Sequence, residues 1–207
     1  MSSLPTTIYL DNAATTFPKP PEVLHAMFED YKRMGVSPGR GSYDLAVRAE
    51  EIVLGVRRQI NDFFCGPAPE RVIFSYNATD ALNTLIFGLV KPGCHVISSR
   101  LEHNSVLRPL HHLREQGIID LDLIPFDSKG FVDPQAVKKG IKRKTALVII
   151  NHASNVLGTI QPVGDIGGIC CECDIPFVID VSQSAGVIPI DMKAWHVDAL
   201  AFTGHKS

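Results

Sequence analysis

Phe177-Val178-Ile179-Asp180 is a run of three apolar residues that ends in a carboxylate, and the helical pattern of Val163–Cys173 precedes it. The same alternation continues outward from this run. A β-rich stretch, Ala146–Ile150, comes before that helix, and another, Ala199–Phe202, comes later in the chain. Near-continuous apolar strands separated by helices are typical of a parallel sheet covered on both faces. The sequence therefore predicts an α/β fold with a mostly parallel mixed sheet and helices on both faces.

Further segments extend the alternation toward the N-terminus. Strands are predicted at Arg71–Tyr76, His95–Ser98 and Leu121–Phe126. Helices are predicted near Thr79–Leu89, Ser105–Gln116 and Pro134–Gly140, over Tyr43–Phe64, and in a stretch that Pro20 and Pro21 open. The apolar period of the Tyr43–Phe64 helix predicts an inner stripe of Leu45, Ala49, Ile52, Val53, Val56, Ile60 and Phe63.

Composition narrows the class of protein. The 207 residues carry 20 Lys and Arg against 22 Asp and Glu, a net charge of −2, which argues against nucleic acid as the main partner. No apolar run approaches the ~20 residues that span a bilayer, so no membrane association is expected. The start, Met1–Pro5, lacks the basic and apolar parts of a secretion signal, and five cysteines at irregular spacing do not suggest a disulfide framework. A cytoplasmic location is expected.

Polar clusters follow five of the predicted strands. They are Asn77-Ala78-Thr79, Glu102-His103-Asn104-Ser105, Ala153-Ser154-Asn155, Asp180-Val181-Ser182-Gln183 and Thr203-Gly204-His205-Lys206. In open α/β sheets, ligands bind beyond the carboxyl ends of the strands. The five clusters are therefore expected to converge on one crevice.

Asp180 and Lys206 suggest a specific chemistry when they occur together. A carboxylate at the rim of a buried strand needs a partner, and the protonated ring nitrogen of a pyridinium cofactor would be one. A helix cap or a loop hydrogen bond is the alternative for Asp180. A lysine in a desolvated crevice can form a Schiff base with a carbonyl, whereas a solvated loop lysine is the alternative for Lys206.

The other clusters allow both binding roles and purely structural roles. The start of a helix at Asn77-Ala78-Thr79 suits a phosphate, but the same residues also make a plain helix cap. His103 either lies over a cofactor ring as an acid or base, or is structural. Asn155 and Gln183 either donate to a cofactor hydroxyl or stabilise loops.

Several other kinds of site are not favoured. Cys170, Cys171 and Cys173 fall in a predicted helix without a second ligand pair and make a poor zinc site, so no metal is expected. Neither GxGxxG nor GxxxxGK[ST] occurs in the sequence, which argues against the usual dinucleotide and nucleoside-triphosphate sites.

With these residues considered, the chain closely resembles the cysteine desulfurase group of the class V aminotransferase-like enzymes, which have fold type I and depend on pyridoxal 5'-phosphate. The resemblance extends over nearly the whole chain. Its motifs are Tyr9–Thr16, Glu102–Ser105, Ser154–Thr159, Asp180–Ser184 and Gly204–Lys206. The sequence departs from the family at Val181 and Ser182, where small residues are usual.

The resemblance implies a role for each candidate residue. Lys206 would form the Schiff base with pyridoxal phosphate and move a proton, and Asp180 would partner the pyridine nitrogen. His103 would stack on the ring and assist proton transfer. Asn155 and Gln183 would bind the phenolic oxygen. The phosphate would be held by Ala78, Thr79, Thr203 and His205.

The resemblance also implies an organisation. Residues 1–16 would be a segment associated with a small domain, and residues 17–207 a truncated, cofactor-binding large domain. Because family members continue past the lysine that matches Lys206, we expect an N-terminal fragment without the C-terminal small domain, the catalytic cysteine or the arginine that binds the substrate carboxylate. None of Cys65, Cys94, Cys170, Cys171 and Cys173 matches the family's nucleophile.

The function implied is a cysteine desulfurase that converts L-cysteine to L-alanine and leaves an enzyme-bound persulfide. A homodimer and a sulfur-acceptor protein are implied with it. A selenocysteine lyase, another β-eliminating lyase or an aminotransferase would use the same cofactor residues, so these alternatives stay open. A non-catalytic, truncated remnant is the alternative of a different class.

Overall fold

A computed structural model of the chain describes residues 8–206. Residues 1–7, which begin the predicted segment 1–16, and Ser207 at the end of the predicted large domain lie outside this part. The described chain divides into two compact units, residues 8–73 together with Lys206, and residues 74–205. Within residues 8–206, every helix is too short or too polar to traverse a bilayer.

The first unit consists of two helices and a short 3-10 turn. They are α1 (Pro21–Met34), α2 (Asp44–Phe63) and η1 (Pro69–Arg71). Pro21 occupies the first turn of α1, where its missing N–H costs nothing, and Lys32 and Arg33 complement the dipole of the last turn. Both predicted helices are confirmed.

The predicted inner stripe of α2 is wrong in most positions. Ala49 is buried, but Leu45, Ile52, Val56 and Phe63 are exposed. Of these exposed residues, Ile52 lines an open apolar groove between α1 and α2 rather than a closed core. The groove is lined mainly by Leu24, Met27, Phe28, Tyr31 and Met34 of α1 and by Ala49, Ile52 and Val53 of α2.

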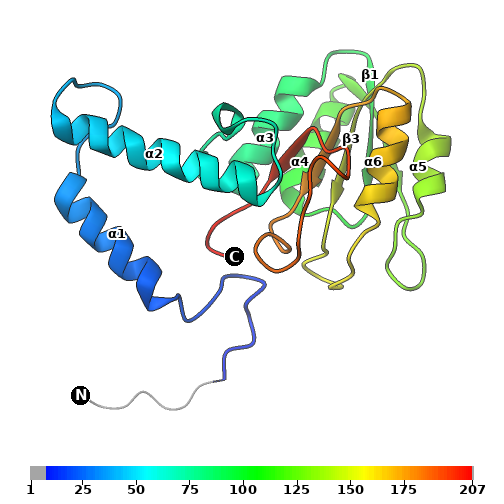
Figure 1. The fold of residues 1–207 in the computed structure, drawn as a ribbon. Helices are drawn as coiled ribbons and strands as arrows, with labels where there is room; N and C mark the ends of the chain where they lie inside the picture. Colours follow the sequence, from blue (N-terminus) through cyan, green and yellow to red (C-terminus); the bar gives the residue numbers. More distant parts are fainter. Residues whose placement is uncertain (1–7, 207) are drawn as a thin grey trace. The chain divides into compact units, whose positions relative to one another are not determined.

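The second unit is a five-stranded parallel sheet in the order β2-β1-β3-β4-β5 (Figure 1). The strands are β1 (Cys94–Ser99), β2 (Ile119–Ile124), β3 (Thr145–Asn151), β4 (Phe177–Asp180) and β5 (Ala199–Ala201). The helices are α3 (Ala78–Leu89), α4 (Asn104–Glu115), α5 (Pro134–Gly140) and α6 (Val163–Glu172). The α/β class and these nine elements agree with the prediction.

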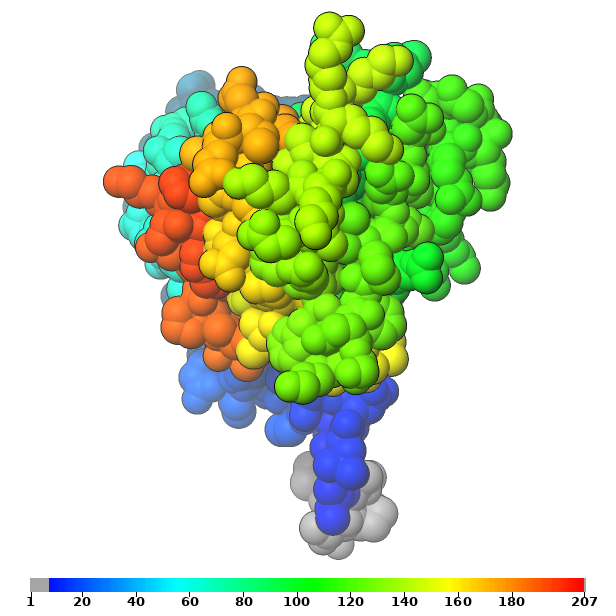
Figure 2. All heavy atoms as spheres, turned by 90° about the vertical axis from the view of Figure 1, so that its right-hand side faces the viewer, coloured from blue at the N-terminus to red at the C-terminus, as the bar shows by residue number. Residues whose placement is uncertain are grey.

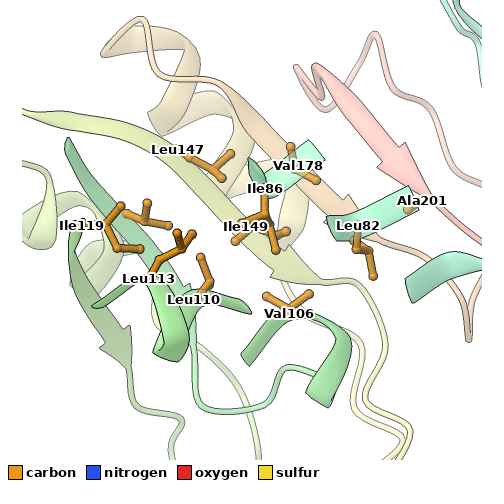
Figure 3. Close-up of a cluster of buried hydrophobic side chains, with 11 residues drawn as sticks. Leu82, Ile86, Val106, Leu110, Leu113, Ile119, Leu147, Ile149, Val178 and Ala201 are labelled. Atoms are coloured by element: carbon orange, nitrogen blue, oxygen red, sulfur yellow. The ribbon is translucent and has the colours of Figure 1, made fainter. Parts of the chain in front are cut away.

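One face of the sheet packs against α3 and α4. Leu82 and Ile86 of α3 and Leu110 of α4 meet alternate strand residues such as Ile149 and Val178 (Figure 3). All five of these side chains are fully buried. Because successive strand residues point to opposite faces, the residues between them, such as Val148 and Ile150, supply the other face.

The opposite face is covered by α5 and α6, which lie next to each other (Figure 2). Gly140 at the end of α5 approaches Ile97, and Gly167 of α6 approaches Phe177. A Cβ atom on Gly167 would also overlap the backbone carbonyl oxygen of Trp195, so only glycine permits this packing. The prediction of helices on both faces is therefore confirmed.

The predicted strand at Arg71–Tyr76 is wrong. Arg71 ends η1, and none of the five described strands pairs with residues 72–76. Val72, Ile73 and Phe74 have high β propensity, but that propensity depends on packing against neighbouring strands. Ile73 and Phe74 are instead exposed, and α3 begins shortly after them.

The strand order places a reversal of direction beside β1. From β1 the chain runs through α4 outward to β2, then through α5 back to β3 on the other side of β1. Ligands of open α/β sheets bind at such a switch point, outside the carboxyl ends of the strands. The segments after β1 and β3 are therefore the first place to examine for a site.

A buried histidine lies near the opposite, amino end of the sheet. His95 Nε2 is 3.1 Å from Asp122 Oδ2, and its Nδ1 is 2.8 Å from the Thr145 hydroxyl. Lys142 Nζ donates to the same Asp122 oxygen at 2.7 Å, and this hydrogen bond lowers the pKa of Asp122. Burial lowers the pKa of His95 below its ordinary 6.5, because the charged ring would lose its hydration.

Replacement of Ile149 by alanine tests the core between the sheet and α3. Ile149 is fully buried in this cluster, so the variant should lose about 2–5 kcal/mol of unfolding free energy. Urea denaturation of the variant measures the loss. Val187→Ala, at a position 70% exposed, is the matched control and should change stability little. Equal losses in both variants would contradict this view of the core.

The acid sensitivity of the fold tests the His95 network. His95 has a lower pKa in the folded chain than in the unfolded chain. Below pH 6.5 the unfolded chain therefore binds more protons, and the free energy of unfolding decreases as the pH is lowered. Buried His152 acts in the same direction. We expect His95→Asn to lessen the loss of stability between pH 6.5 and 5, measured by urea denaturation. The exposed control His112→Asn should retain the full slope, and an unchanged slope in His95→Asn would refute the assignment.

Candidate functional site

The polar residues after four of the strands lie at the carboxyl edge of the sheet. Asp180 is the last residue of β4 and pairs in register with Asn151 of β3 and Ala201 of β5. The segments with His103, Asn155, Gln183 and Thr203 follow β1, β3, β4 and β5. Since all five strands are parallel, their carboxyl ends share one edge.

The N-terminus of α3 lies at the same edge. Asn83 Nδ2 donates to the Ser105 carbonyl oxygen at 3.2 Å, which brings the start of α3 beside the start of α4. Asn77 is the N-cap of α3, and its side chain accepts from the Asp80 N–H at 2.9 Å. Ala78 and Thr79 occupy the first turn, whose backbone N–H groups have no partner within the helix and suit an anion.

His103 is the N-cap of α4. Its Nδ1 accepts from the Ser105 N–H at 3.1 Å and lies 2.8 Å from the Ser105 hydroxyl. Because Nδ1 accepts the backbone N–H, the neutral ring carries its proton on Nε2. The side chain is exposed, so this histidine combines a fixed ring with access to a ligand.

Asp180 is a buried carboxylate held by local donors. Its Oδ1 accepts from the Ser182 N–H at 2.9 Å and from the Ser182 hydroxyl at 2.6 Å. The residue is 7% exposed, so the anion has lost most of its hydration. A buried carboxylate is stable only with compensating donors or a positive partner, and a cationic ring nitrogen would supply the latter.

A second buried carboxyl group lies near Asp180, and the sequence analysis did not assign it a role. Glu102 is 6% exposed, and its Oε1 accepts from the Ser99 hydroxyl at 2.6 Å. Burial, together with a smaller effect of the negative charge of Asp180, raises the pKa of Glu102 to about 8, although hydrogen bonds from Ser99 and Asn151 act in the opposite direction. Glu102 Oε2 and Asn151 Oδ1 are buried without a hydrogen-bond partner in the structure.

His152, just after β3, is a further residue that the sequence analysis missed. Its N–H donates to the Asp180 carbonyl oxygen at 2.8 Å, and its Nδ1 lies 2.9 Å from the Ser184 hydroxyl. The Trp195 ring meets the imidazole edge to face, with centroids 5.1 Å apart. Burial lowers the pKa of His152, so the ring is neutral and braces the end of β4. Its position directly after an apolar strand was the available signal.

The remaining predicted residues differ in exposure. Thr79, Asn155 and His205 are exposed, whereas Gln183 and Thr203 are half-buried. Lys206 belongs with the first unit, where the Thr16 hydroxyl donates to its backbone carbonyl oxygen at 2.7 Å. The cofactor contacts expected of these residues stay predictions.

The edge of the second unit fits pyridoxal phosphate in its charge and donor pattern. The first turn of α3 offers N–H groups for a phosphate, and Asp180 offers a buried anion for the ring nitrogen. Two buried oxygens without partners, Glu102 Oε2 and Asn151 Oδ1, add unfilled hydrogen-bonding capacity at the ends of β1 and β3. Across residues 8–206, no group of three or more His, Cys, Asp or Glu side chains is placed to hold a metal ion.

Comparison with known proteins agrees with this pattern. The family model described as aminotransferase class-V matches residues 8–207. A probable cysteine desulfurase of Methanothermobacter thermautotrophicus is 36% identical over 200 residues, which are 96% of this chain and 49% of that protein. The cysteine desulfurase IscS of Dictyoglomus turgidum is 34% identical over 203 residues, 96% of this chain and 50% of that protein. The chain thus spans about half the length of these curated relatives.

Solved structures share the fold. The apo structure of a cysteine desulfurase from Thermococcus onnurineus superimposes with a TM-score of 0.89 at 34% identity, over 96% of this chain and 50% of that one. A structure described as SspA in complex with cysteine gives a TM-score of 0.89 at 31% identity, over 97% and 58%. These neighbours confirm the predicted fold type I architecture, and this chain spans 50–58% of their length. From the family match over nearly all of its residues, the chain belongs to the aminotransferase class-V family, whose members depend on pyridoxal phosphate.

Proposed function

We propose that this chain is the cofactor-binding half of a cysteine desulfurase, which converts L-cysteine to L-alanine and leaves the sulfur as a persulfide on an enzyme cysteine. The observation that carries the proposal is the buried Asp180 carboxylate at the same sheet edge as the N-terminus of α3. An anion there suits a pyridinium nitrogen, and the helix N-terminus suits a phosphate.

The relatives support the choice of substrate. The protein from Methanothermobacter is named a probable cysteine desulfurase and that from Dictyoglomus a cysteine desulfurase. SspA is described in complex with cysteine. Because the chain spans about half of those relatives, the activity is proposed for the whole protein that contains this chain.

In the proposed site, Asp180 stabilises the protonated pyridine nitrogen. Bound pyridoxal phosphate withdraws electrons from the substrate Cα, which makes that carbon more acidic. His103 would stack on the ring and would assist proton transfer through its Nε2. Asn155 and Gln183 donate hydrogen bonds to the phenolic oxygen.

The phosphate is bound by a further set of groups in this proposal. Ala78 and Thr79 contribute the N–H groups of the first turn of α3, and Thr203 and His205 contribute polar side chains after β5. The same helix start provides a dipole whose positive end favours the dianion.

Lys206 has two roles in the proposal. Its Nζ would hold the cofactor covalently and would carry the proton removed from the substrate Cα. An enzyme thiolate would attack the sulfur of cysteine and form an S–S bond as the C–S bond breaks. The electron pair of the C–S bond would stay with the carbon skeleton, which would take up protons to become alanine. Cys170 is unsuited to be that thiolate, because burial raises its pKa to about 12.

The proposal includes the setting of the enzyme. We place it in the cytoplasm, as a homodimer that passes sulfur to an acceptor protein, with residues 1–16 beside a small domain and residues 17–207 as the large domain. The exposed thiols of Cys65, Cys171 and Cys173 are compatible with a reducing compartment.

Lys206→Ala tests the covalent role of Lys206. Incubation with pyridoxal phosphate followed by borohydride should add the mass of the reduced cofactor to the original chain, and intact-mass spectrometry should show no addition in the variant. Lys193→Ala, at an exposed position a short distance upstream, is the control and should still gain the mass. Addition to Lys206→Ala at the same level as the control would refute the assignment.

The products formed from L-cysteine test the reaction class. With a reducing thiol present, the whole protein that contains this chain should release alanine and sulfide in equal amounts, both dependent on Lys206. A keto acid product without sulfide would mark an aminotransferase. The same cofactor mass with no product from cysteine would favour the non-catalytic alternative.

Asn77→Asp tests the phosphate position. Aspartate keeps the cap of α3, so stability should stay unchanged, but it adds a negative charge beside the phosphate. We expect this repulsion to weaken the binding of pyridoxal phosphate roughly tenfold, which corresponds to about 1.4 kcal/mol of binding free energy. Binding of pyridoxal, which has no phosphate, should change little. Equal weakening of both ligands, measured by fluorescence titration, would place the phosphate elsewhere.

A further inference from the structure

Two carboxyl groups lie close together at the carboxyl edge of the sheet, and only one of them has a proposed role. Asp180 ends β4, whereas Glu102 lies in the turn between β1 and α4. The Asp180 charge acts directly on Glu102. Two neighbouring buried carboxylates cannot both ionise cheaply, so one of them keeps a proton.

The hydrogen bonds distinguish the two groups. Asp180 Oδ1 accepts from both the N–H and the hydroxyl of Ser182, and such donors stabilise an anion. Glu102 Oε1 accepts from the Ser99 hydroxyl, whereas within residues 8–206 Glu102 Oε2 is buried without a hydrogen-bond partner of good geometry. A buried anionic oxygen without a donor is costly, whereas a protonated one is a neutral hydroxyl.

The side chain of Asn151 supports the same assignment. The backbone N–H of Asn151 lowers the pKa of Glu102 and offsets part of the effect of burial, whereas its Nδ2 donates to the carbonyl oxygen of Leu101, the residue before Glu102, at 2.9 Å. Its Oδ1 is buried and lacks a donor. Protonation of Glu102 Oε2 adds a hydrogen-bond donor on a residue that neighbours Asn151, whose own side-chain acceptor is unsatisfied.

We propose that Glu102 is a positioning residue, which holds the single proton of the Glu102–Asp180 pair on Oε2 and so keeps Asp180 ionised for a cationic ligand. The location of the proton is a property of the chain alone. Its use in holding a pyridinium ring rests on the proposed function.

Other ionisable groups surround this pair. Arg100 and His103 flank Glu102 in the chain and are exposed, and His152 follows β3 and is neutral because of its burial. Of these neighbours and Asp180, the charge of Asp180 is the one that raises the pKa of Glu102, after burial itself. Ionisation of Glu102 is therefore expected near pH 8.

The first test follows the side-chain carboxyl carbons of glutamate by NMR in the full chain without ligand, labelled with ¹³C and titrated from pH 4 to 9. One resonance should titrate near pH 8, vanish in Glu102→Gln and persist in the exposed control Glu115→Gln. Titration of every glutamate below pH 6 would overturn the proposal. So would persistence of the high transition in a folded Glu102→Gln chain.

The second test asks whether this proton affects the ligand. Pyridoxal phosphate is bound at pH 6–9, and the absorbance of its ring is followed. The original chain should show a transition at the same pH as the glutamate resonance, and Glu102→Gln should lack it while Glu115→Gln retains it. An identical transition in Glu102→Gln would overturn the link between Glu102 and the ligand. Failure of every chain to bind pyridoxal phosphate would instead overturn the proposed function, and the NMR titration would still decide where the proton lies.

Discussion

The parallel pairing of β3 with β4 is the constraint on which the rest of the structure depends. Four consecutive pairs, from Val148 with Phe177 to Asn151 with Asp180, hold the centre of the sheet together. The apolar members of these pairs are fully buried, so the register is set by packing on both faces. A slip by one residue would turn the Asp180 side chain to the opposite face of the sheet.

This register also explains why the polar residues are tolerated. Asn151 and Asp180 form the last residue pair of β3 with β4, and both are buried. Their polar side chains therefore need hydrogen bonds from other groups of the protein. Several of these hydrogen bonds are made by residues that follow β3 and β4: the Ser182 N–H donates to Asp180, and His152 pairs with the Ser184 hydroxyl. Hydrogen-bond donors are lacking at Glu102 Oε2 and Asn151 Oδ1, and the proton proposed on Glu102 would provide one there.

Features that depend on neighbouring residues in the sequence could be predicted, whereas features that depend on contacts between distant segments could not. Val163–Glu172 and Phe177–Asp180 could be predicted because helical period, strand composition and burial all agree there. The prediction of a strand at Arg71–Tyr76 was wrong because β propensity is a local property of the sequence, whereas a strand also needs a neighbouring strand to pair with, and local sequence does not show whether one exists. Glu102 was not recognised as one of a carboxyl pair for a similar reason: its proximity to Asp180 arises from the strand order, with β3 between them.

Gly167 connects the far side of the sheet to this edge. Its missing side chain lets α6 rest on the backbone at Trp195, the Trp195 ring abuts His152, and the His152 N–H holds the Asp180 carbonyl oxygen. The carboxylate is thus supported through a short mechanical linkage that begins on the opposite surface. A substitution of Gly167 would therefore displace the Asp180 carboxylate, although α6 itself contacts no ligand in the proposed site. The residue at this position of α6 is thus restricted by the geometry of a site on another part of the sheet.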